Sequence, residues 1–205
     1  MRNNRILVTY ASRAGSTAGV AAAIGKTLRT PTPPPSLRDT SPIFQITENR
    51  GGWAGAQVDV MPMQDVKDLS PYRAVVAGSA IRKSKWLPEA VGFIQTHRET
   101  LARKPFVMFT VCITLAMSDS EQYRSAVAGW VAPVRAIVRP LSEGLFAGML
   151  DFSKLPVNLD TLKLRATVAS GIFPRGDRRD WNAIRAWAES LKPVIRDMKE
   201  KEETT

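Results

Sequence analysis

The chain has 205 residues, of which 44% are hydrophobic and 23% charged, as is ordinary for one soluble globular domain. Its 29 Lys and Arg outnumber its 19 Asp and Glu, and the net charge of +10 favours anionic partners without choosing among them. The single cysteine, Cys112, excludes internal disulfides, and no run of about 18 apolar residues predicts a membrane span. We expect a cytoplasmic protein, because the first apolar run, residues 6–10, is too short for a signal peptide.

The first third of the chain predicts a strand, a helix and a long excursion. Residues 5–10 are β-branched and apolar, as in a strand that is buried on both faces. Apolar residues then recur at helical spacing within residues 20–28. Prolines and glycines interrupt the pattern between residues 30 and 55 and predict a surface insertion, in which residues 43–46 are an alternative short strand.

Strand and helix signals alternate after this insertion. Four short apolar runs predict strands, at residues 57–61, 74–79, 106–112 and 144–149. One helix is expected from Pro88, a favoured first-turn residue, through Leu101. Two more are expected within residues 121–138, where Pro133 bends or divides the helix, and from Trp181, with Asp177 and Asp180 as capping residues. We therefore predict one domain over residues 1–198, with an insertion at 30–55 and a disordered tail at 199–205.

The alternation of strands and helices predicts an α/β fold, a three-layer sandwich with helices on both faces of a five-stranded parallel sheet. In the strand order 2-1-3-4-5, a ligand binds at the carboxyl ends of strands 1 and 3, beside the point where the order reverses. The loops that follow Tyr10, Ala77 and Val111 are therefore the ones expected to form a site.

The loop after the first strand has the composition of a phosphate site. Its residues are Ser12, Arg13, Ala14, Gly15, Ser16 and Thr17. The loop ends at a helix N-terminus, where unpaired N–H groups and the positive end of the helix dipole favour a dianion. The hydroxyl groups add donors, and the glycine permits a close backbone approach. The alternative is an ordinary helix cap formed by Ser16 or Thr17.

Several other site classes are excluded or unsupported. The only histidine, His97, has no second histidine with which to form a metal site or a catalytic triad. Gly19 and Gly25 are separated by five residues where a P-loop needs four, and they fall inside the predicted helix. The sequence contains no basic stripe with interleaved aromatic residues, so it does not predict nucleic-acid binding. No general acid or base is identified.

Residues 10–17 resemble the FMN-phosphate signature of the flavodoxins. Residues 72–82 and 176–181 resemble segments of the menaquinone-dependent protoporphyrinogen oxidases and their flavodoxin-domain relatives. This resemblance implies that FMN is bound non-covalently, with its phosphate on residues 12–17. It also implies that two segments flank the isoalloxazine ring, namely Ser79, Ala80, Ile81, Arg82 and Lys83, and Val111, Cys112, Ile113 and Thr114.

The chain departs from an electron-transfer flavodoxin in the loops expected at the ring. The loop from Cys112 to Met117 has no aromatic residue, so ring binding would depend on backbone hydrogen bonds and aliphatic contact. Cys112 is alternatively a small core residue. Arg82, Lys83 and Lys85 would stabilise reduced, anionic FMN and raise its reduction potential, unless these side chains only point into water.

The resemblance implies an FMN-dependent oxidoreductase related to protoporphyrinogen oxidase, with a quinone or an electron-transfer protein as redox partner. The alternatives are a dedicated electron carrier and a flavodoxin-like interaction protein that has lost FMN. Residues 151–175 are leucine-rich and basic. This segment predicts either peripheral contact with an anionic membrane or a surface subdomain that covers the sheet edge.

Overall fold

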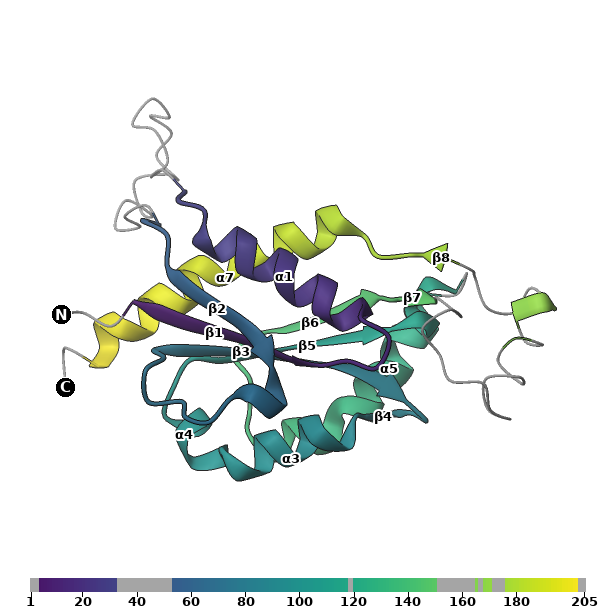
Figure 1. The fold of residues 1–205 in the computed structure, drawn as a ribbon, viewed down its shortest axis with the longest axis horizontal. Coiled ribbons are helices and arrows are strands. Elements are labelled where there is room, and N and C mark those ends of the chain that lie inside the picture. The colour runs from purple at the N-terminus through teal and green to yellow at the C-terminus, as the bar shows by residue number, and fades with distance from the viewer. Residues whose placement is uncertain are drawn as a thin grey trace.

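The computed structural model describes residues 4–32, 53–117, 120–150, 165, 168–170 and 176–202. Five parallel strands form its central sheet in the spatial order β2-β1-β3-β5-β6, which confirms the predicted order 2-1-3-4-5 (Figure 1). These strands are β1 (Arg5–Ala11), β2 (Gln57–Pro62), β3 (Ala74–Arg82), β5 (Phe106–Cys112) and β6 (Glu143–Ala147).

Helices cover both faces of the sheet, as the alternating pattern predicted. One layer holds α1 (Ser16–Arg29) and α7 (Trp181–Glu202). The opposite layer holds α3 (Pro88–Thr96), α4 (Arg98–Ala102) and α5 (Ser120–Arg135) (Figure 1). Because side chains alternate along a strand, Ile6 packs in the core beneath α1 and α7, whereas Leu7 packs in the core on the other face.

The β3 strand ends differently from the prediction. It continues past Ser79 to Arg82 and then reverses into β4 (Lys85–Trp86), which pairs with it antiparallel. The two turn residues, Lys83 and Ser84, have φ of 50° and 58°. Such a two-residue turn favours Asn-Gly, and Lys-Ser carries no such sequence signal, so the hairpin was not predicted.

The helices also differ in detail. Pro88 begins α3, as predicted, but the helix ends before His97, so His97 separates α3 from α4 instead of lying within one helix. Pro133 lies inside α5 and does not divide it. Asp180 caps α7 by accepting hydrogen bonds from the backbone of Asn182 and Ala183.

Short elements complete the described structure. They are the 3-10 helices η1 (Met63–Asp65) and η2 (Ile113–Ala116) and the two-stranded sheet of β7 (Met149–Leu150) and β8 (Gly176–Asp177). A bridge between Thr32 and Trp53 joins the two described ends of the predicted insertion.

The alternative strand at 43–46 and most of residues 151–175 lie outside the described residues. The α7 helix continues through Glu202, into the predicted tail, and the domain boundaries stay a prediction. Within the described ranges, no helix combines the length and apolar character needed to cross a membrane.

Candidate functional site

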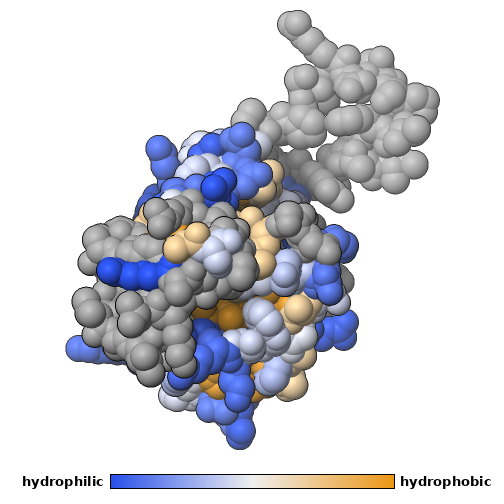
Figure 2. Space-filling model, turned by 90° about the vertical axis from the view of Figure 1, so that its right-hand side faces the viewer, coloured by the Kyte–Doolittle hydropathy of each residue, from blue (hydrophilic) through white to orange (hydrophobic). Residues whose placement is uncertain are grey.

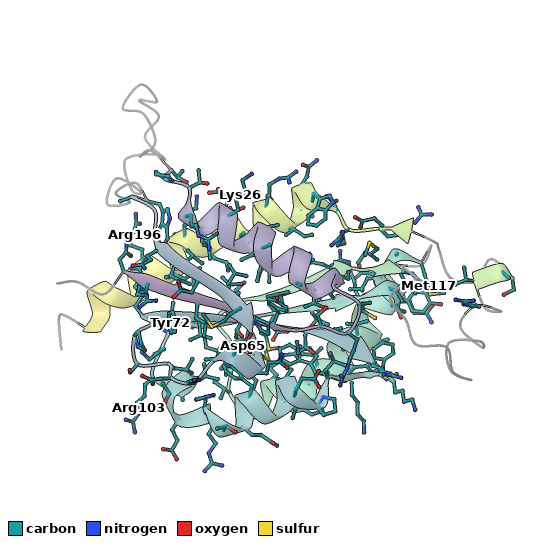
Figure 3. The ribbon with its side chains drawn as sticks, viewed as in Figure 1. Lys26, Asp65, Tyr72, Arg103, Met117 and Arg196 are labelled. Carbon is teal, nitrogen blue, oxygen red and sulfur yellow. The ribbon has the colours of Figure 1, made fainter. Side chains whose placement is uncertain are left out.

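The three loops expected to form a site follow strands that end at the same edge of the sheet. Ala11 of β1 pairs with Ser79 of β3, Ala80 pairs with Val111 of β5, and Cys112 pairs with Ala147 of β6. This edge lies at the right of Figure 1, where β7 and β8 also lie. In Figure 2, apolar residues are visible at this edge beside hydrophilic side chains of the described part of the chain. In Figure 3, Met117 lies at this end of the molecule, and Tyr72 and Arg103 lie at the other end.

The first loop presents a helix N-terminus without a side-chain cap. Gly15 is the N-cap residue, with φ of 82°, and its N–H donates to Ser12 Oγ at 3.0 Å. No side chain among the described residues caps the helix, and its first turn contains no acidic residue. The alternative in which Ser16 or Thr17 caps the helix is therefore wrong. The first turn of α1 retains the N–H groups and positive dipole that favour an anion.

Thr17 adds a buried donor to this turn. Its side chain is fully buried, and Thr17 Oγ1 has no hydrogen-bond partner among the described residues. A buried hydroxyl without a partner costs about 1–3 kcal/mol, so such groups are rare in the absence of a function. A phosphate oxygen at the start of α1 would accept this hydrogen bond, and the residues present therefore fit a phosphate group.

Two other residues of the loop are held by neighbouring elements. Ser16 Oγ accepts a hydrogen bond from the backbone N–H of Met149 in β7 at 3.0 Å. Arg13 pairs with Glu89 in the first turn of α3, with 3.1 Å between Arg13 Nη2 and Glu89 Oε2. Both side chains of this pair are substantially exposed, so it contributes little to stability. These contacts connect the loop to β7 and to α3.

The second predicted segment divides into a buried part and an exposed part. Ser79 is fully buried, and its hydroxyl donates to the Ala80 carbonyl and accepts from the Leu87 N–H at 3.1 Å. The Ser79 side chain thus connects β3 to Leu87, the residue that follows β4. Ala80 and Ile81 are half-buried, whereas Arg82 and Lys83 are exposed on the hairpin.

The third predicted segment also faces partly into the core. The side chains of Val111 and Cys112 are buried in opposite cores, so only their backbones are available at the edge. Ile113 and Thr114 follow in η2 and are half-buried. Trp86 is likewise a core residue, and its Nε1 donates to Thr110 Oγ1 at 2.9 Å. The aromatic ring nearest in sequence to the hairpin turn is therefore unavailable for stacking on a ligand.

Cys112 is expected to be unreactive in the folded protein. Burial raises the pKa of its thiol, outweighing hydrogen bonds with Thr114 that lower it. Above the ordinary thiol pKa, the unfolded chain loses this proton while the folded chain keeps it, so the free energy of unfolding falls as pH rises. We predict slow reaction with iodoacetamide at pH 8 and rapid reaction in denaturant, followed by mass spectrometry. Equal rates in both conditions would contradict the burial of Cys112.

The sequence analysis missed two contributors to the site, the β7–β8 sheet and Arg179. The β7–β8 sheet lies against the first loop, because the Met149 N–H donates to Ser16 Oγ. Arg179, which follows β8, donates from Nη1 to the Ser16 carbonyl at 3.4 Å. Asp177, expected to cap α7, instead forms a bidentate ion pair with Arg179. Residues 176–181 stood out only by resemblance, and no local pattern indicates a contact with residues so distant in sequence.

Comparison with known proteins identifies the family of the chain. The family profile described as "Flavodoxin domain" matches residues 39–162, which is more than half of the chain. The matched range begins after the loop at residues 12–17. A search of curated proteins finds no match.

Solved structures are similar to this chain at low sequence identity, and one of them exceeds a TM-score of 0.5. An oxidoreductase from Corynebacterium diphtheriae is 12% identical, with a TM-score of 0.53, over 96% of this chain and 99% of that chain. A flavodoxin from the Archaea is 15% identical, with a TM-score of 0.42, over 94% and 99%. A flavoprotein in complex with FMN from Lactobacillus acidophilus is 12% identical, with a TM-score of 0.42, over 69% and 93%. The profile match and the parallel sheet order together establish that the chain belongs to the flavodoxin domain family.

Proposed function

We propose that this protein binds FMN non-covalently and acts as a redox protein, with the FMN phosphate on the first turn of α1. The observation that carries the proposal is the buried hydroxyl of Thr17, which has no hydrogen-bond partner in the described structure and lies at an uncapped helix N-terminus. The flavodoxin domain family and the FMN complex of the Lactobacillus flavoprotein support the choice of cofactor. FMN supplies the transfer of electrons or hydride when it is bound.

Different residues of the chain would bind the phosphate and the ring of FMN. Ser12, Ser16 and Thr17 offer hydroxyls to the phosphate, and Gly15 lets the backbone approach it. Ala80, Ile81, Ile113 and Thr114 are half-buried at the same sheet edge and offer aliphatic and backbone contact to the ring.

Binding is tested by titrating the purified chain with FMN and with riboflavin, using flavin fluorescence and the visible spectrum. We expect saturable FMN binding that is at least tenfold tighter than riboflavin binding, because only FMN carries the phosphate. Absence of binding to either flavin would overturn the proposal and leave an interaction protein that has lost FMN.

The exposed hairpin residues predict a shift in reduction potential. Arg82, Lys83 and Lys85 place three positive charges beside the proposed ring site, where reduced and anionic FMN would be stabilised. We expect Lys83→Gln to lower the two-electron potential by roughly 5–20 mV, since an exposed charge is worth ~1 kcal/mol or less and 30 mV is about 1.4 kcal/mol. The measurement is a redox titration at low salt.

A matched control is Arg103→Gln, which removes one positive charge at the opposite end of the molecule (Figure 3). This variant is expected to leave the potential unchanged at the same ionic strength. Equal shifts in both variants, or no shift in Lys83→Gln, would show that the hairpin charges do not act on the flavin.

The substrate of the redox protein is proposed from resemblance and charge. We propose an oxidase that removes electrons from a carboxylate-bearing porphyrinogen and passes them to a quinone, because the net charge of +10 favours an anionic substrate or an anionic membrane. Purified holoprotein is assayed with protoporphyrinogen and a quinone. Electron transfer only to a protein acceptor would identify an electron carrier instead.

A further inference from the structure

We propose that the positive charge of Arg179 strengthens the preference of the site at the first turn of α1 for a phosphorylated flavin over an unphosphorylated one. The inference rests on the proposed FMN function and assigns a role to a residue outside the loop at 12–17. It is carried by three observations: the contacts of the Arg179 guanidinium with α1, the direction of its ion pair, and its near-complete burial.

The Arg179 guanidinium contacts the first turn of α1. Arg179 Nη1 donates to the carbonyl of Ser16 at 3.4 Å. It also occupies the space beside Gly19, because a Cβ atom added there would lie 2.4 Å from Arg179 Nη1. Gly19 thus allows the charge to approach the same helical turn that carries the buried Thr17 hydroxyl.

The side chain has little freedom to leave this place. Its exposed fraction is 11%, and its Cζ lies 4.3 Å from the centre of the Trp181 ring. Arg179 Nη2 also lies 3.8 Å from the Met149 sulfur. Cation–π stacking and partial desolvation both hold an arginine in one geometry, so its charge is fixed with respect to α1.

The ion pair with Asp177 is oriented so that its positive side faces the helix. Asp177 Oδ1 accepts from Arg179 Nε at 2.7 Å, and Asp177 Oδ2 accepts from Nη2 at 2.7 Å. The carboxylate therefore occupies the edge of the guanidinium formed by Nε and Nη2, whereas Nη1 faces Ser16 and Gly19. Strong hydrogen bonding from Arg179 lowers the pKa of Asp177, so the pair stays charged at neutral pH. An anion at the start of α1 would then lie closer to the cation than to the carboxylate.

The electrostatic role predicts opposite effects for the two partners. Arg179→Gln removes the positive charge and is expected to weaken FMN binding roughly tenfold while leaving riboflavin binding unchanged. Asp177→Asn removes the compensating negative charge and keeps an acceptor for Arg179, so FMN binding is expected to strengthen about threefold. A purely structural pair would instead lose affinity for both flavins in both variants.

The test measures the FMN and riboflavin dissociation constants of wild type, Arg179→Gln, Asp177→Asn and Arg135→Gln. Arg135 forms a comparable bidentate pair with Glu143 at the start of β6, away from the sheet edge that carries the loop, and its variant is the matched control. An unchanged FMN-to-riboflavin ratio in Arg179→Gln, with wild type binding FMN, would overturn this inference alone. Failure of wild type to bind FMN would overturn the proposed function.

If Arg179→Gln does not fold, Arg179→Lys is the second test variant. It retains the positive charge and loses the bidentate geometry of the guanidinium. We expect Arg179→Lys to retain a preference for FMN that weakens as salt rises. Loss of that preference at low salt would show that this bidentate geometry, and not the charge, is what the site requires, and would overturn the electrostatic role.

Discussion

Thr17→Val is expected to stabilise the protein without FMN and to weaken its binding of FMN. Valine has nearly the shape of threonine, so the substitution removes a buried hydroxyl that has no partner in the described structure and leaves the packing of α1 intact. We expect the free energy of unfolding without ligand to rise by about 1 kcal/mol. Affinity for FMN should fall roughly 10- to 100-fold, because a hydrogen bond to a charged phosphate contributes about 1.5–3 kcal/mol. Urea unfolding and FMN titration measure the two quantities.

Thr27→Val is the matched control for this experiment. Thr27 is a buried threonine on the same helix, but its hydroxyl donates to the Ala23 carbonyl at 3.1 Å. This variant is expected to change the free energy of unfolding by about 0.5 kcal/mol or less and to leave FMN binding unchanged. If Thr17→Val instead lowers stability without ligand and leaves FMN affinity unchanged, the Thr17 hydroxyl is part of the fold and not of a phosphate site.

The contrast between these threonines shows what the sequence could and could not predict at the loop. The position of residues 12–17, after a buried strand and before a helix, was enough to predict a phosphate site. Which of these hydroxyls is engaged by neighbouring backbone depends on contacts that the composition of the loop does not reveal. Ser16 accepts a hydrogen bond from Met149, and Ser12 accepts one from Gly15, whereas Thr17 has no hydrogen-bond partner in the described structure.

The sheet was predictable because its signals are local. Continuous apolar runs in β1 and β5 indicate strands that are buried on both faces, and alternation with helices fixes a parallel order. The β3–β4 hairpin was missed because its turn uses Lys83 and Ser84 in a conformation that favours glycine and asparagine. The Arg179 contact with Ser16 was missed because it joins residues at opposite ends of the chain.

Gly78 shows how a residue near the predicted ring segment can serve packing instead. It lies in β3 and pairs with Phe109 of β5. A Cβ atom added to Gly78 would lie 2.0 Å from Phe109 Cζ, and the Phe109 ring is fully buried. The ring packs against Trp187 with 6.4 Å between centroids, so it has little room to move away. Glycine is therefore required at this position by the neighbouring strand.

Gly78→Ala is accordingly expected to lower the free energy of unfolding by about 3 kcal/mol, the upper range for overpacking a core. Gly92→Ala is the matched control, because a Cβ atom at Gly92 in α3 would have no atom of the described residues within 4 Å. That variant should raise stability by about 0.5–1 kcal/mol, since alanine favours a helix over glycine. Urea unfolding measures both changes.

A double variant separates the clash from any other effect of the Gly78 substitution. Phe109→Leu removes the ring atoms that the new Cβ would meet, so Gly78→Ala should cost about 1–2 kcal/mol less in that background than in wild type. Equal costs in both backgrounds would mean that the backbone of β3, and not the Phe109 ring, requires glycine. Since the Phe109 ring packs beneath α1 and α7, relief of the clash is expected to restore stability without altering the affinity of the folded protein for FMN.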